Sequence, residues 1–355
     1  AIGAYAFDAA NGGEHDSVAI GVYALSSETS SSGCVAIGSD ALKLQNRASS
    51  QNTAIGYLAG AAIPASTGGV SSTILGYNAV GVGAMTGNNN TVLGHNAGVN
   101  ITSPDDCVII GESACGTGVL TGNNNVVVGV TAGEDLTSGY SNVLIGKAAG
   151  LNLTDNYGCI AIGHAALDAA NIGEHDNVAI GTNALGKETS GADGCIAIGR
   201  GALSEQNQDS SNNTAVGHKA ATNLAGGTDS VFVGYEAGGV GTITGDYNTV
   251  LGAHAAKNAT SARTSVFVGQ SAGGVGVITG AANVAIGNAA GYDLTSGNNN
   301  VLVGTDAGAN ITTAQNNVAI GSGAWATGVG VASGGAAGQY NVVVGGGAGN
   351  DLTDG

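Results

Sequence analysis

The chain has 355 residues, of which 65 are glycine, 43% are apolar and only 4% are aromatic, and its net charge is −17. The apolar share is too high for a disordered chain, and 2 prolines without a glycine at every third position exclude collagen. No stretch of 18 apolar residues exists to span a membrane. The negative charge disfavours nucleic acid and anionic membranes as partners.

A nine-residue pattern recurs along the whole chain, as in NTAIGYLAG at 52–60, NTVLGHNAG at 90–98, NVLIGKAAG at 142–150 and NVAIGNAAG at 283–291. We call its central glycine slot 0 and number the other positions of the repeat from it. Slot 0 falls at twenty glycines from Gly3 to Gly345, which are 342 residues apart over 19 intervals, a mean of 18. Such internal repeats predict one array of stacked units rather than two globular domains.

Each repeat is predicted to hold one short strand directly before slot 0. Slots −3 and −1 carry β-branched or aliphatic residues, such as Val143 and Ile145, which favour strands. Because alternate side chains share a face, we expect slots −3 and −1 to point into the core and slot −2 to point away. The glycine of slot 0 permits a positive φ, and the alanine at slot +3 indicates a tight turn. The predicted tight-turn residues include Gly146, Ala149, Gly287 and Ala290.

Slot −2 is apolar in every repeat, although it is expected to lie outside the core. A strand that is apolar on both faces is covered on both faces, and a long apolar stripe is too large to leave exposed on a soluble monomer. We therefore predict that slot −2 is an interface between copies of the chain; a tolerated, alanine-rich surface is the alternative. The predicted interface residues are Ile74, Val92, Ile109, Leu144, Phe232, Val250, Phe267, Leu302 and Val343.

Slot −4 holds Asn, Ser or Cys in nearly every repeat, and stacked asparagines are predicted to form hydrogen bonds from coil to coil. Four of the five cysteines occupy this slot, and their spacing is not that of a metal site. Two interpretations stay open: small buried thiols that replace Ser or Asn, and thiols of neighbouring chains that crosslink. These cysteines are Cys34, Cys107, Cys159 and Cys195.

A longer period is superimposed on the short one, because residues 8–21 return almost unchanged at 168–181, 160 residues later. We therefore predict one β-solenoid array over residues 1–355, built from super-repeats 1–160 and 161–320 and a partial third, 321–355. The chain starts and stops inside a repeat, so we expect an excerpt of a longer fibre protein.

Coils of stacked parallel strands explain these patterns, so the predicted fold is all-β, a parallel β-solenoid of about 20 coils with a 17–18-residue repeat. The repeats also resemble the head repeats of YadA-like trimeric autotransporter adhesins. They resemble even more the NTAIGYxAG arrays of bacteriophage tail fibres and related bacterial surface fibres, although the family's head repeats are shorter.

This resemblance implies a left-handed β-roll in each chain and a homotrimer about a common axis. It also implies an extracellular location, on a cell surface or a virion, and a structural segment that gives a fibre stiffness, length and surface attachment. The expected partners are further copies of the chain, in a trimer or a longer filament, and a host-surface glycan or protein. We expect no nucleic acid partner and no membrane insertion by this segment.

We expect no enzyme activity and no cofactor, apart from weak Ca²⁺ binding by acidic loops such as Asp105-Asp106 and Glu134-Asp135. Glu14-His15-Asp16 is a less favoured metal candidate. GTNALGKE at 181–188 and GQSAG at 269–273 nearly match a P-loop and a nucleophile elbow, but both keep the ordinary repeat register, and no histidine base is expected beside the serine. Two alternatives remain: a single-chain solenoid that binds ice or carbohydrate and, less favoured, a hexapeptide-type acyltransferase.

Overall fold

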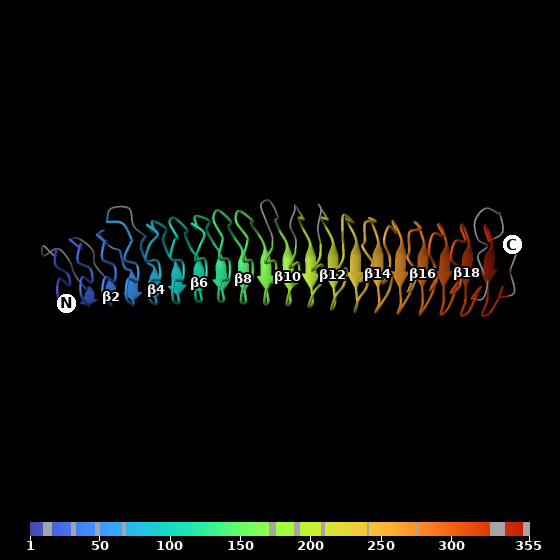
Figure 1. Cartoon of the computed structure of the whole chain (residues 1–355), viewed down its shortest axis with the longest axis horizontal. Coiled ribbons are helices and arrows are strands. Elements are labelled where there is room, and N and C mark those ends of the chain that lie inside the picture. The colour runs from blue at the N-terminus through green and yellow to red at the C-terminus, as the bar shows by residue number, and fades with distance from the viewer. Residues whose placement is uncertain are drawn as a thin grey trace. The chain divides into compact units, whose positions relative to one another are not determined.

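The computed structural model describes residues 1–9, 16–29, 33–46, 50–65, 69–169, 175–187, 192–206, 210–239, 241–274, 276–326 and 338–350. The chain divides into two compact units, Ala1–Asp176 and Asn177–Gly355. Each unit is a stack of coils in which one short strand per coil pairs with the strand of the next coil (Figure 1). The super-repeat boundaries at 160 and 320 stay a prediction from the sequence.

Every described strand has three residues and ends directly before a slot-0 glycine. The first unit contains β1 (Val18–Ile20), β2 (Val35–Ile37), β3 (Thr53–Ile55), β4 (Thr73–Leu75), β5 (Thr91–Leu93), β6 (Val108–Ile110), β7 (Val126–Val128), β8 (Val143–Ile145) and β9 (Ile160–Ile162). The second unit contains β10 (Val178–Ile180), β11 (Ile196–Ile198), β12 (Thr214–Val216), β13 (Val231–Val233), β14 (Thr249–Leu251), β15 (Val266–Val268), β16 (Val284–Ile286), β17 (Val301–Val303), β18 (Val318–Ile320) and β19 (Val342–Val344).

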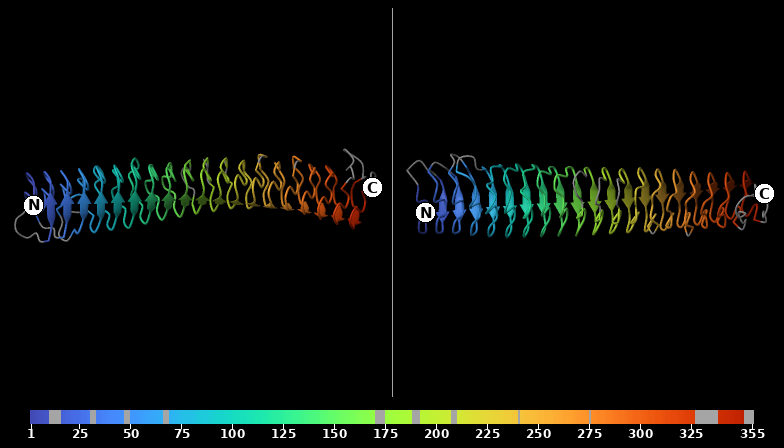
Figure 2. Two further views of the ribbon diagram at one scale, coloured as in Figure 1. Left: turned by 90° about the horizontal axis from the view of Figure 1, so that it is seen from below. Right: turned by 45° about the horizontal axis from the view of Figure 1, so that its top comes forward.

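Within each unit the pairing is parallel and in register, so that each slot forms a column along the stack. Ala19 of β1 lies beside Ala36 of β2, and Phe232 of β13 lies beside Val250 of β14. Figure 2 shows the successive strands side by side along each stack. The predicted all-β parallel β-solenoid is thereby confirmed, with a spacing close to 18 residues. The predicted count of about 20 coils is slightly too high, because the described residues form 19 strands. Handedness and the homotrimer stay predictions.

The chain turns at slot 0 because only glycine fits there. At Gly146, φ is +135°, and an added Cβ would overlap the carbonyl oxygen of Gly163 in the next coil. Three residues on, the N–H of Ala149 donates to the carbonyl of Gly146 at 3.3 Å, and the methyl group is fully buried. The second predicted pair, Gly287 and Ala290, has the same arrangement, with φ of +139° at the glycine.

The turn continues through two residues in the left-handed region, at slots +2 and +4, and many of them are not glycine. Ala148 at slot +2 has φ of 57°, and Leu25 at slot +4 has φ of 50°. A left-handed conformation costs an L-residue about 1–2 kcal/mol. The cost is offset by hydrogen bonds to neighbouring coils, such as the N–H of Ala148 to the carbonyl of Val130 at 2.9 Å.

The strands face the opposite way from the sequence prediction. The middle residue of each described strand, slot −2, is buried inside its own coil, whereas slots −3 and −1 are half-buried or exposed. The interface prediction for slot −2 is therefore wrong, because side chains that fill the core of one chain are not available to a second chain. These core residues are Ile74, Val92, Ile109, Leu144, Phe232, Val250, Phe267, Leu302 and Val343.

The core of each coil, which we call the inner column, contains the side chains of slots −2 and +4. A large side chain at one of these slots is often matched by a small one at the other. Where slot −2 is large, slot +4 is often glycine: an added Cβ at Gly238 would lie 2.7 Å from the ring of Phe232. Where slot −2 is alanine, slot +4 is often leucine, as in the buried pair Ala36 and Leu42. Core packing is sensitive to single methylene groups, so this exchange keeps each coil filled.

Candidate functional site

The first candidate surface is the outer strand face, which we define as the side chains of slots −3 and −1 on β1–β9 of the first unit and on β10–β19 of the second. Its two rows contain only Val, Ile, Leu and Thr, without a charged residue. Ile20, Leu75 and Leu251 are 37%, 40% and 45% exposed. A contiguous exposed apolar surface of this kind marks an interaction site.

Ring columns add flat, polar-edged surface to the first unit. Tyr57, Tyr77 and His95 occupy slot +1 of consecutive coils, and their ring centroids are 5.4 and 5.2 Å apart. A second column at slot −6 stacks Tyr140 on Tyr157 at 5.0 Å. Such pairs contribute about 0.5–1.5 kcal/mol each beyond their buried area. Sequence reasoning missed both columns, although the recurrence of aromatic residues at one slot of consecutive repeats was the available signal.

The asparagines of slot −4 form the predicted ladder. The amide of Asn142 donates to Oδ1 of Asn125 at 3.1 Å and to the carbonyl of Asn156 at 2.8 Å. Its Oδ1 accepts the backbone N–H of Cys159 in the next coil at 3.0 Å. This hydrogen bonding between coils is confirmed, and it satisfies polar backbone groups that would otherwise be buried without partners.

The cysteines of slot −4 take the same place in the ladder. Sγ of Cys107 accepts the backbone N–H of Asn125 at 3.3 Å, as Oδ1 of asparagine does elsewhere. All five cysteines are buried thiols, and burial raises the pKa of Cys107 and of Cys115. The interchain crosslink is therefore the wrong interpretation, because each of these side chains is enclosed by its own coil. The four slot −4 thiols, each fully buried, are those of Cys34, Cys107, Cys159 and Cys195.

The acidic loops are engaged in the turns between coils. The carboxylate of Asp105 accepts the backbone N–H of Asn88 at 2.6 Å, and that of Asp106 accepts the amide of Asn89 at 3.0 Å. Among the residues that the structure describes, no three His, Cys, Asp or Glu side chains converge as metal ligands would. Glu14 and His15 lie outside the described residues, and weak Ca²⁺ binding stays a prediction.

The serine of GQSAG does have a histidine neighbour, contrary to the expectation from sequence. Ser271 and His254 occupy slot +2 of consecutive coils and line one cavity of about 210 Å³. Nδ1 of His254 lies 3.4 Å from the carboxylate of Glu236, but Lys257 holds that carboxylate at 2.8 Å and its hydrogen bond lowers the pKa of Glu236. The described contacts contain no hydrogen bond between Ser271 and His254, so the arrangement lacks the contact that activates a nucleophile.

The fold and these surfaces define a class, the parallel β-solenoid repeat proteins. Compared with known families and with curated proteins, the chain matches no family model and no curated sequence. In the part of the chain that the structure describes, no helix has the length and apolar character needed to cross a bilayer.

Proposed function

We propose that this chain is a structural, non-enzymatic segment of an extracellular fibre, related to YadA-like adhesin heads and phage tail-fibre arrays. In this proposal, copies of the chain associate through the outer strand face, as a homotrimer. The observation that supports it most is that this face carries two rows without a single charge in a chain of net charge −17. Apolar surface gains about 25 cal/mol for each Å² removed from water, so a second copy is a favourable cover.

The mechanical role follows from the coil. Parallel ladder bonds, the slot −4 ladder and the filled inner column join each coil mainly to its neighbours, so stability sums coil by coil and repeat number sets length. Full burial of one Val, Leu or Phe contributes about 1.5–3 kcal/mol. The negative charge lies off the outer strand face and keeps separate fibres apart.

The test is the solution mass of the chain by light scattering, with circular dichroism alongside. We expect a β-rich particle of three chains. The variant Leu251→Asp with Val266→Asp places two charges on the outer strand face and is expected to give a folded monomer. Thr305→Asp, at an exposed slot +1 position, is the matched control and should keep three chains together. A monomeric wild-type chain would overturn the association.

A single-chain binding module is the second candidate, and the same face supports it. The outer row of β3, β4 and β5 begins with Thr53, Thr73 and Thr91 in consecutive coils, which gives hydroxyl groups at regular spacing beside aliphatic ones. A stable monomer that shows thermal hysteresis would favour an ice-binding surface. A monomer without it, retained by immobilised polysaccharide, would favour carbohydrate.

A further inference from the structure

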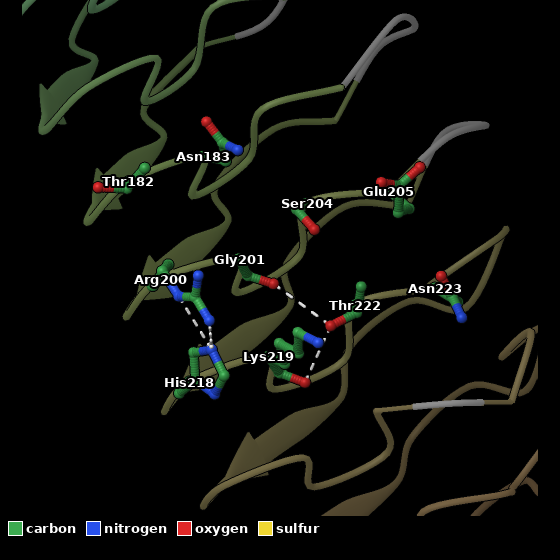
Figure 3. Close-up of a pocket in the computed structure, with 10 residues that line it drawn as sticks. All are labelled: Thr182, Asn183, Arg200, Gly201, Ser204, Glu205, His218, Lys219, Thr222 and Asn223. Atoms are coloured by element: carbon green, nitrogen blue, oxygen red, sulfur yellow. Dashed lines mark hydrogen bonds between the residues drawn. The ribbon is translucent and has the colours of Figure 1, made fainter.

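A cavity of about 390 Å³ opens in the second unit beside the turns that follow β10, β11 and β12 (Figure 3). Its floor is Gly201, at slot +2, between Asn183 and Lys219 of the neighbouring coils. Because Gly201 has no side chain, a gap remains between the slot +2 side chains of the two neighbouring coils, and this gap is part of the cavity.

The glycine is not required by packing. An added Cβ at Gly201 would meet Cγ of Lys219 at 3.6 Å and Oγ of Ser204 at 3.7 Å, which are ordinary contact distances. Its φ of +68° is left-handed, but Asn183 adopts φ of 54° at the same slot. The fold therefore accepts a side chain here, and the cavity is a local feature of this coil.

Two cations in the cavity have no carboxylate partner among the described contacts. Of the other five described Lys and Arg side chains, four do have one: Lys43 with Asp40, Lys187 with Glu205, Lys257 with Glu236, and Arg263 with Asp246. Lys147, in the first unit, has none among the described contacts, but no second cation lies with it in a described cavity. Arg200 instead donates from Nε and Nη2 to Nε2 of His218, at 3.0 and 2.7 Å. Lys219 lines the same cavity. Two exposed cations that line one cavity without acidic partners, in a chain of charge −17, mark a place for an oxyanion.

The other residues that line the cavity have polar side chains, although part of the surface that they present is aliphatic, and together they carry little net charge. Hydroxyl groups come from Thr182, Ser204 and Thr222, and amides come from Asn183 and Asn223. The one carboxylate, on Glu205, is paired with Lys187 at 2.7 Å, so its charge is offset. This combination suits a small molecule that carries several hydroxyl groups and one anionic group. The volume is at the lower end of the range for ligand pockets, about 300–1,000 Å³.

We propose that this cavity binds one acidic saccharide unit, with its carboxylate, phosphate or sulfate group on Arg200 and Lys219 and its hydroxyl groups on Ser204, Thr222 and Asn183. Gly201 provides the space. The site lies on the turns rather than on the outer strand face, so it does not depend on how copies of the chain associate.

The experiment is calorimetric titration of the full chain with glucuronate, glucose 6-phosphate and glucose 6-sulfate, and with neutral glucose and inorganic phosphate as comparison ligands. We expect at least one acidic sugar to bind at least tenfold more tightly than glucose and than inorganic phosphate. The ranking of the three sugars identifies the anionic group. Inorganic phosphate binding as tightly as every acidic sugar would overturn the saccharide, and equal binding of glucose would overturn the charge argument.

Variants separate the site from general charge effects. Arg200→Gln and Lys219→Gln should each weaken binding about tenfold or more, because each removes a charged hydrogen-bond donor. Gly201→Asn should abolish binding by filling the cavity, with an unchanged circular dichroism spectrum. Lys147→Gln is the matched control, since Lys147 is an exposed cation of the first unit outside the cavity. Unchanged binding in the first three variants, or an equal loss in Lys147→Gln, would overturn the proposal.

Discussion

The two faces of one three-residue strand follow different rules. The inner slot ranges in size from Ala19 to Phe232, and slot +4 compensates across the coil. The outer slots hold to Val, Ile, Leu and Thr, although no described segment of the chain covers them. Side chains that vary in size, with a neighbour in the same coil that compensates, are typical of a core. Side chains of uniform type that nothing in the described chain covers are typical of a surface that makes a flat contact with a partner.

The sharpest way to break this comparison is to place one charge on each side of β13. Phe232 is 1% exposed and its neighbour Val231 is 40% exposed. Phe232→Asp should destabilise the second unit by at least about 4 kcal/mol, since it buries an unpaired carboxylate. Val231→Asp should leave the chain folded, with a change of less than about 1 kcal/mol. Urea unfolding followed by circular dichroism measures both, and equal losses would contradict the assignment of faces.

The volume exchange predicts a compensating pair. Phe267→Ala should cost about 3–5 kcal/mol, because it leaves a cavity above Gly273. Gly273→Leu alone should also destabilise, since its Cβ would lie 2.8 Å from the Phe267 ring. Combined, the two changes should recover part of the loss, because Leu25 and Leu42 already adopt this left-handed slot with φ of 50° and 49°. Additive losses in a double-mutant cycle would refute the exchange.

The slot −4 ladder predicts a smaller effect that depends on an acceptor atom. Asn142→Ala removes the acceptor for the N–H of Cys159 and should cost about 1–3 kcal/mol. Asn142→Ser should cost less, since Oγ of Ser72 accepts the N–H of Asn90 at the same slot. Thermal or urea unfolding of the two variants checks the order. If serine is as damaging as alanine, the ladder is not held by this acceptor.

The smallest effect on stability is expected on the outer face. Ile286→Thr keeps a β-branched side chain at a position that is 39% exposed, so stability should change by no more than about 0.5 kcal/mol. Repeated on several outer slots, the same change should weaken self-association measured by light scattering. Large losses of monomer stability would show that the outer strand face is covered within the chain.

The repeat made much of the fold predictable, because its 18-residue period, its glycine and its slot −4 asparagine each have one physical explanation. The direction of the strand was not predictable from alternation, because both faces are apolar. The pairing of Phe232 with Gly238 indicates that slot −2 faces the core. This signal becomes visible only when slot −2 and slot +4 are compared within each coil.

The sites formed by polar side chains could not be predicted from the sequence for a different reason. Neighbours in a solenoid column are mostly 17–18 residues apart in sequence, so His254 and Ser271 become neighbours only when the same slot of consecutive coils is aligned. The cavity at Gly201 is defined by a side chain that is missing from such a column. Glycine is the commonest signal of a turn in this chain, so nothing in the sequence distinguishes Gly201 from the glycines that form ordinary turns.

The left-handed residues of the turn have a kinetic consequence. In the folded stack, hydrogen bonds to carbonyls of neighbouring coils offset the cost of these conformations, as the carbonyl of Val130 does for Ala148. A single coil that adopts the same conformations alone has no such carbonyls, so their cost is not offset. The first coils are therefore a costly nucleus, and each later coil is laid down on a finished template. Folding of this kind proceeds by the addition of one coil at a time to the end of the folded stack. It is compatible with synthesis on the ribosome, where the repeats emerge one after another.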